Sequence, residues 1–115
     1  MKNETTLNEM LNLNELFNLT PFIEKKYAQL SLGNKQKMLI IQALIDNSSI
    51  LILDEPFNSL DTQTSEILKE YLIQFKKKGI LIISSHYKND IEEISDVLIQ
   101  IENGGIINWE KTFQK

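Results

Sequence analysis

Several features are missing from this 115-residue sequence, and each absence excludes a class of protein. There is no cysteine, which excludes disulfides and thiol-based metal or catalytic sites. No run approaches the roughly 20 apolar residues that a membrane-spanning helix needs, and the N-terminus has no apolar block of a signal peptide. The formal net charge of -4 argues against broad electrostatic binding to nucleic acid. We therefore expect a soluble, intracellular protein that reaches a membrane only through a partner.

The composition that remains is that of an ordinary folded domain. Hydrophobic residues make up 42% of the chain and charged residues 24%, as is typical of globular proteins. The length predicts one small domain. Because short chains bury a smaller share of their surface, a missing neighbouring segment would leave apolar surface exposed and favour self-association.

Hydrophobic periodicity predicts helices in the first part of the chain. Apolar residues at helical spacing indicate a helix over residues 7–17, which Pro21 separates from a short segment over 22–29. Between residues 34 and 45 the apolar side chains cover more than one face of a predicted helix. Such a helix is normally well buried.

Two aliphatic runs predict parallel strands. Residues 50–53 and 80–83 are too short for helices and do not alternate, as expected of strands covered on both faces. Between them, a helix should open at Asp61 and end at Gly79, with the lysines at 76–78 in its solvated last turn. Together these segments form a parallel βαβ unit.

The last segment predicts a β-hairpin. Apolar runs over residues 97–101 and 106–109 flank Asn103-Gly104-Gly105, a turn sequence. The predicted fold class is therefore α/β. Residues 1–46 form a helical segment in this prediction, and residues 47–115 form the parallel core and the hairpin.

Polar residues follow both predicted strands, at the edge where open parallel sheets bind ligands. Asp54 and Glu55 follow the first strand, and Ser84, Ser85 and His86 follow the second. In nucleotide chemistry, Asp54 would hold Mg²⁺ mainly through water, and Glu55 would orient or deprotonate the attacking water. Taken alone, the carboxylate pair is equally consistent with a turn, and His86 with a hydrogen-bonded structural histidine.

The order of four motifs resembles that of ABC ATPases, over residues 7–110. Residues 30–37 (LSLGNKQK) are similar to the signature motif, 50–55 (ILILDE) to Walker B with its glutamate, 58–61 (NSLD) to the D-loop, and His86 to the switch histidine. The resemblance implies a partial P-loop NTPase fold. It also implies ATP and Mg²⁺ as ligands, and a second ABC ATPase domain that pairs head to tail around two ATP molecules.

For individual residues, the resemblance implies that Asp54 serves Mg²⁺, Glu55 the hydrolytic water and His86 the γ-phosphate. A second group would act at the nucleotide of the opposite domain or across the dimer interface. This group contains Ser31, Leu32, Gly33 and Asp61. Free N–H groups at the start of a helix favour binding of an anion such as the phosphate of that nucleotide. Leu32 would contribute only its backbone, because it stands where the family usually has a glycine. The S-L-G-x-K-Q form of residues 31–36 is similar to that of bacterial bacitracin- and lantibiotic-type exporter ATPases.

One motif of the family has no counterpart in this sequence. None of the glycines begins the phosphate-binding motif G-x-x-x-x-G-K-[ST], so the chain alone should bind ATP poorly and hydrolyse it negligibly. The interpretation is therefore the C-terminal half of the ATP-hydrolysing subunit of a bacterial transporter. Such a subunit lies at the cytoplasmic face of the membrane and binds a membrane-spanning partner.

Two other interpretations remain open. One is a soluble ABC-type ATPase that acts on ribosomes or DNA. Ribosome-acting members typically have N-H-L-D where residues 58–61 read N-S-L-D, which favours the transporter. The other is a non-catalytic fragment that pairs with a complete ATPase. The missing phosphate loop suggests it, whereas the intact Asp54, Glu55 and His86 argue against it.

Overall fold

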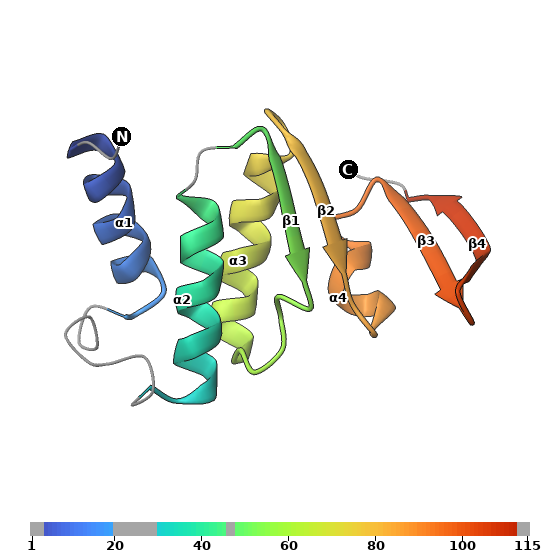
Figure 1. The fold of residues 1–115 in the computed structure, drawn as a ribbon, viewed down its shortest axis with the longest axis horizontal. Helices are drawn as coiled ribbons and strands as arrows, with labels where there is room; N and C mark the ends of the chain where they lie inside the picture. The colour runs from blue at the N-terminus through green and yellow to red at the C-terminus, as the bar shows by residue number, and fades with distance from the viewer. Residues whose placement is uncertain (1–3, 20–29, 46–47, 113–115) are drawn as a thin grey trace.

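The computed structural model describes residues 4–19, 30–45 and 48–112. Its elements, in chain order, are α1 (Glu4–Leu16), α2 (Leu32–Leu44), β1 (Ile50–Asp54), α3 (Thr62–Phe75), β2 (Ile80–Ser84), α4 (Lys88–Glu92), β3 (Val97–Glu102) and β4 (Gly105–Lys111). Figure 1 shows α1 at one end of the molecule and the β3–β4 hairpin at the other. The predicted α/β class is confirmed. The segment predicted over 22–29 and the division predicted after residue 46 fall outside the described residues.

The strands β1 and β2 form the parallel pair predicted from the two aliphatic runs. Their register runs from Ile50 opposite Ile80 to Asp54 opposite Ser84, and α3 is the helix that connects them. Because the strands run parallel and in register, their carboxyl ends meet at one edge of the sheet. Asp54 and Ser84 therefore lie side by side at that edge.

The strands β3 and β4 form the predicted hairpin as a separate antiparallel sheet. Glu102 pairs with Gly105, which leaves Asn103 and Gly104 as a two-residue turn. Both turn residues have positive φ, at 50° and 78°. This is the combination that a type I′ turn requires and that Asn-Gly supplies.

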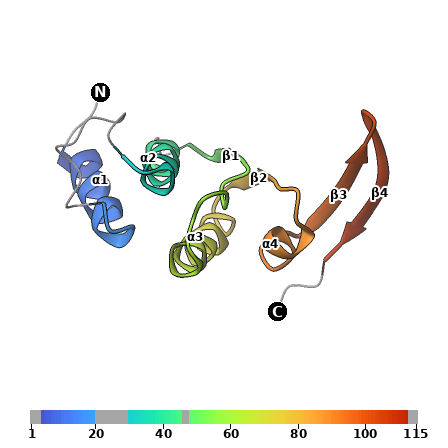
Figure 2. The ribbon, with the colours of Figure 1, turned by 90° about the horizontal axis from the view of Figure 1, so that it is seen from below.

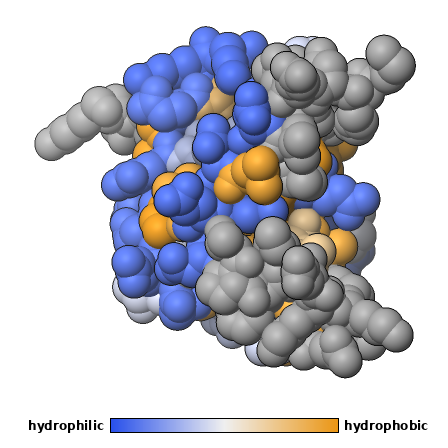
Figure 3. All heavy atoms as spheres, turned by 90° about the vertical axis from the view of Figure 1, so that its left-hand side faces the viewer, coloured by the Kyte–Doolittle hydropathy of each residue, from blue (hydrophilic) through white to orange (hydrophobic). Residues whose placement is uncertain are grey.

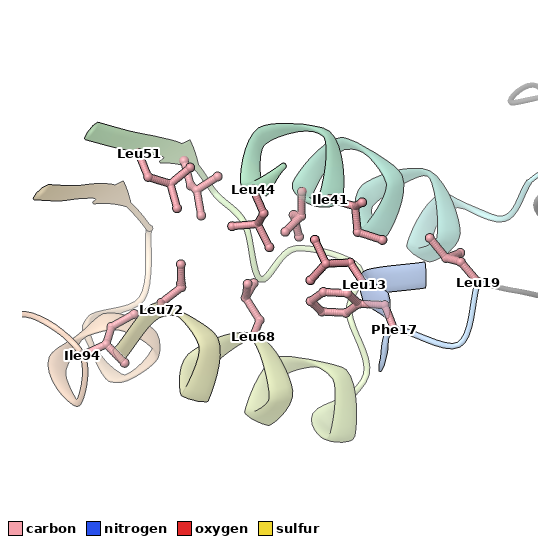
Figure 4. Close-up of a cluster of buried hydrophobic side chains, with 11 residues drawn as sticks. Leu13, Phe17, Leu19, Ile41, Leu44, Leu51, Leu68, Leu72 and Ile94 are labelled. Carbon is pink, nitrogen blue, oxygen red and sulfur yellow. The ribbon is translucent and has the colours of Figure 1, made fainter. Parts of the chain in front are cut away.

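The hydrophobic core lies between the helices and one face of β1. At its centre are Leu68 and Leu72 of α3, both 0% exposed. Figure 4 shows these side chains pointing towards Leu51 of β1 and Leu44 of α2, with Phe17 at the end of α1 closing the cluster. Leu68 and Leu72 stand four residues apart on α3, so one face of this helix is turned to the core.

The opposite face of the β1–β2 sheet is open. Ile50, Ile52, Ile80 and Ile82 are between 49% and 67% exposed. Figure 2 shows α3 and α4 on one side of the strands only. The prediction that both faces are covered is therefore wrong for the described residues, because their helices pack on a single side. At the α1 end, by contrast, the described surface in Figure 3 is mainly hydrophilic, with scattered apolar patches.

Helix α2 also buries less than predicted. It begins at Leu32 rather than Asn34, and buries Ile40, Ile41 and Leu44. The neighbouring Met38 and Leu39 are 40% and 52% exposed. The prediction of burial on more than one face is wrong here, because the described elements pack against one side of the helix. Among the residues described, no helix combines the length and apolarity needed to span a membrane.

The end of α3 differs from its prediction in two ways. The helix ends at Phe75, and Lys76 is not a solvated residue, because its Nζ donates to the carbonyl oxygen of Ile94 at 2.9 Å and to Asp96 Oδ1 at 3.0 Å. Gly79 does not adopt positive φ. It is needed for close packing instead, since a Cβ there would lie 2.7 Å from the carbonyl oxygen of Ser49.

Candidate functional site

Ser84 links the ends of β1 and β2. Its hydroxyl donates to Oδ1 of Asp54. The backbone N–H of Glu55 donates both to the Ser84 carbonyl and to the Ser84 hydroxyl oxygen, at 3.1 Å each. These bonds fix the Asp54 carboxylate and the start of the following loop at the sheet edge. Ser84 was predicted to lie at this edge, with no function of its own.

Glu55 and His86 come together although they follow different strands. The distance between Glu55 Oε1 and His86 Nε2 is 3.3 Å. The Glu55 side chain is 20% exposed, while the His86 side chain is 85% exposed. A half-buried carboxylate thus lies beside an imidazole that faces solvent. The structure therefore brings Asp54, Glu55 and His86 to one edge, as the strand ends predicted.

The backbone of Glu55 is unusual. Its φ is +51°, in the left-handed region that residues other than glycine and asparagine seldom occupy. No sequence feature predicted this conformation. It turns the chain sharply where β1 ends, and the Glu55 carboxylate lies beside His86, in the segment that follows β2.

Ser31, Leu32 and Gly33 form the start of α2. Ser31 is the N-cap residue, and its Oγ accepts a hydrogen bond from the N–H of Asn34 at 3.1 Å. Leu32 is 70% exposed. It does not adopt positive φ, so the conformational freedom of the usual glycine is not needed at this position. The first turn of α2 presents free backbone N–H groups, as any helix N-terminus does.

Asp61 caps α3. Its Oδ1 accepts a hydrogen bond from the Thr64 N–H at 2.7 Å. The hydrogen bonds from Thr64 lower the pKa of the Asp61 carboxyl below its ordinary value, and the positive charge of Lys37 lowers it further. The predicted opening of this helix at Asp61 is confirmed, and the carboxylate is engaged in capping.

Gln36, to which the sequence pattern assigned no function, joins the two groups of candidate residues. This side chain lies on α2, and its Nε2 donates to the carbonyl oxygens of Glu55 and Pro56, at 3.1 Å each. It therefore connects the helix that begins at Ser31 to the loop that carries Glu55. Its sequence indications were its place in the signature-like motif of residues 30–37 and its spacing, one helical turn after Gly33.

Comparisons with known proteins identify the family. The ABC transporter family model matches residues 2–58, and the chain is 38% identical over 105 residues to the uncharacterized ABC transporter ATP-binding protein YhaQ of Bacillus subtilis (strain 168). These matches support an ABC ATPase domain in this chain. The match covers 90% of this chain and 35% of YhaQ. Both the predicted family and the predicted fold are confirmed.

Two further relatives of this ABC ATPase domain are informative. The lantibiotic transport ATP-binding protein SrtF of Streptococcus pyogenes is 38% identical over 90% of this chain and 44% of SrtF. The solved dimeric structure of MJ0796, a bacterial ABC transporter cassette, matches with a TM-score of 0.84 and 25% identity, over 96% of this chain and 49% of that one. The chain therefore spans less than half the length of each of these relatives.

Proposed function

We propose that this chain is the catalytic-carboxylate part of the ATP-hydrolysing subunit of a bacterial ABC transporter. The observation that carries the proposal is the 3.3 Å approach of Glu55 Oε1 to His86 Nε2 at the carboxyl edge of a parallel sheet. In sheets of this kind, that edge is where ligands bind. Similarity to ABC transporter ATP-binding proteins supports a nucleotide as the ligand.

Asp54 is the proposed residue for Mg²⁺, and its surroundings fit such an ion. The carboxylate lies at the sheet edge and accepts the Ser84 hydroxyl on Oδ1, which leaves its second oxygen to accept from metal-bound water. Mg²⁺ keeps several of its waters and takes few carboxylates, so one exposed aspartate at this edge suffices. When bound, the ion would neutralise charge on the β- and γ-phosphates.

Glu55 and His86 are the proposed catalytic residues. The Glu55 carboxylate is held in place by its backbone, and would accept a hydrogen bond from the attacking water and orient it. The exposed imidazole of His86 would donate to the γ-phosphate. Because Glu55 Oε1 and His86 Nε2 lie 3.3 Å apart, a water bound to Glu55 and a phosphate oxygen bound to His86 would lie next to each other.

The remainder of the site must come from elsewhere in a cassette. The 115 residues contain no phosphate-loop motif and span 49% of the MJ0796 cassette. We propose that a further cassette segment supplies this loop and covers the open face of the β1–β2 sheet. The apolar character of Ile52 and Ile82, both more than half exposed, supports this proposal.

The proposed partners are a second ATPase domain and a membrane-spanning subunit at the cytoplasmic face of the membrane. Ser31, the Leu32 backbone and Gly33 would meet the γ-phosphate held by the second domain, with the loop around Asp61 at the interface. The capped N-terminus of α2 suits such an anion. Similarity to a dimeric cassette and to the lantibiotic transport protein SrtF supports both partners.

The test is MgATP turnover by the complete cassette that contains this chain. Glu55→Gln keeps the size of the side chain but removes its ability to act as a base. We expect kcat to fall about a hundredfold or more while nucleotide binding is retained. Glu70→Gln, the same substitution at an exposed position on α3, is the matched control. If the Glu55 variant turns over ATP as fast as this control, the assignment of Glu55 is wrong.

A further inference from the structure

The loop that follows β1, residues 55–60, contains two residues in the left-handed region. Glu55 has a φ of 51° and Ser59 a φ of 65°. Neither is glycine or asparagine, the residues that adopt this conformation most readily. Such backbone conformations persist only where the surrounding structure imposes them. We call residues 55–60 the carboxylate loop.

Helix α2 contacts the carboxylate loop at Glu55. The Gln36 side-chain amide has two N–H groups, and its nitrogen donates to two consecutive carbonyl oxygens, those of Glu55 and Pro56, at 3.1 Å each. The side chain is partly buried. Holding both carbonyls fixes the peptide planes on either side of Pro56, and so limits the rotation of the Glu55 backbone.

The same helix contacts the loop at Ser59. A Cβ atom at position 33 would lie 2.8 Å from the Ser59 carbonyl oxygen, closer than two such atoms normally approach. Glycine at this position therefore lets the Ser59 backbone approach the first turn of α2. The two left-handed residues of the loop are thus each in contact with α2, one through Gln36 and the other through Gly33.

The spacing of these contacts shows that they belong to one face of the helix. Gly33, Gln36 and Lys37 stand at positions i, i+3 and i+4, which share a face of an α-helix. Lys37 acts electrostatically on Asp61, immediately after the loop. This face of α2 therefore follows the carboxylate loop from one end to the other.

We propose that this face of α2 is a brace that sets the backbone of the carboxylate loop, with Gln36 as the positioning residue for Glu55 and Gly33 for Ser59. The catalytic consequence rests on the proposed function. A displaced carboxylate loop would move the Glu55 carboxylate away from the position proposed for the attacking water.

The first test replaces Gln36 by Glu, which keeps the shape of the side chain but sets a carboxylate against two carbonyl oxygens. The readout is the intraresidue amide-to-Hα nuclear Overhauser effect of Glu55 in the full-length protein, which is strong only at positive φ. We expect it to weaken in Gln36→Glu and to stay strong in Gln42→Glu, the same change at an exposed position on α2. An unchanged effect at Glu55 in a folded Gln36→Glu variant overturns the brace.

The second test keeps the proposal falsifiable if Gln36→Glu does not fold. Gly33→Ala adds a single methyl group against the Ser59 carbonyl. Gly105→Ala is its control, because a Cβ there would lie 3.8 Å from the nearest neighbouring atom. We expect amide shift changes across residues 55–60 with Gly33→Ala and none there with Gly105→Ala. If Gly33→Ala changes the amide shifts of residues 55–60 no more than Gly105→Ala does, the brace is refuted.

Turnover separates this proposal from the proposed function. With the loop displaced, kcat of the complete cassette should fall about tenfold or more, while the KM for ATP changes little. If the effect at Glu55 is lost but kcat is unchanged, the brace stands and the catalytic assignment of Glu55 fails. If Glu55→Gln abolishes turnover but Gln36→Glu alters neither the loop nor kcat, the assignment stands and the brace fails.

Discussion

The two faces of the β1–β2 sheet are built from the same kinds of residue but are covered very differently. On one face, Leu51 and Leu53 are each 6% exposed and pack in the core beneath α3. On the other, Ile50 and Ile52 are 49% and 67% exposed. These residues alternate along a single aliphatic strand. An aliphatic run of this kind is typical of a parallel strand covered on both faces, whereas the described residues of this chain cover only one.

The covered face stabilises the fold of this chain by itself, whereas the open face is available to other elements. Burial of the covered face contributes to folding within the chain. Water remains in contact with the open face, where the isoleucines gain little from folding. Substitutions on the two faces should therefore have effects of different size and kind.

The largest effect is expected on the covered face. Leu68→Ala, on the helix α3 that packs against this face, removes a side chain that is 0% exposed, and should lower the free energy of unfolding by about 2–5 kcal/mol. Ile52→Ala, on the open face, should lower it by less than about 1 kcal/mol. Urea denaturation of both variants measures the difference. Equal losses would mean that the open face is covered in solution.

The next largest effect is expected on the self-association of the chain through its open face. The paired change Ile52→Ser and Ile82→Ser makes the open face polar while leaving the covered face intact. Because exposed apolar patches drive self-association, the wild-type chain should sediment as concentration-dependent oligomers, and the double variant should shift towards monomer. Leu11→Ser, at a side chain 45% exposed on α1, is the control and should leave association unchanged. Identical sedimentation of the wild type and the double variant would contradict the prediction.

The sequence predicted those features of the fold that depend on local pattern. The two aliphatic runs set the strands, and the polar residues that follow them, from Asp54 and Ser84 onward, set the edge of the candidate site. Asn103-Gly104 set the hairpin turn, because only residues tolerant of positive φ suit it. Each of these features depends on residues close together in the chain, which is why the sequence alone was sufficient.

Features that depend on distant contacts were not predictable. Nothing in a glutamate indicates positive φ at Glu55, because the conformation is held by Gln36 and Ser84 from other elements. Lys76 lies in a run of lysines that is typical of a solvated helix end, yet its side chain reaches the Ile94 carbonyl. The openness of one sheet face was also hidden, since side-chain chemistry does not tell which chain segment supplies the second layer.

The smallest effect is expected at the N-terminus of α3, the helix that covers the buried face. Hydrogen bonds from Thr64 lower the pKa of the Asp61 carboxyl in the folded state. A carboxyl with a lowered folded pKa contributes stability that is present above its unfolded pKa and is lost as the pH falls through the folded pKa. Stability of the wild type should therefore decline in acid partly because this cap is lost.

Two substitutions at position 61 separate the charge from the cap. Asn retains an oxygen that accepts from the Thr64 N–H, so Asp61→Asn should keep most of the stability at neutral pH but decline less in acid. Asp61→Ala removes the cap at every pH and should be less stable than Asp61→Asn throughout. Urea midpoints measured from neutral to acidic pH, with amide exchange at Thr64 as the local readout, test both expectations. If wild type and Asp61→Asn decline in parallel in acid, the Asp61 charge does not stabilise α3, and the covered face depends on packing alone.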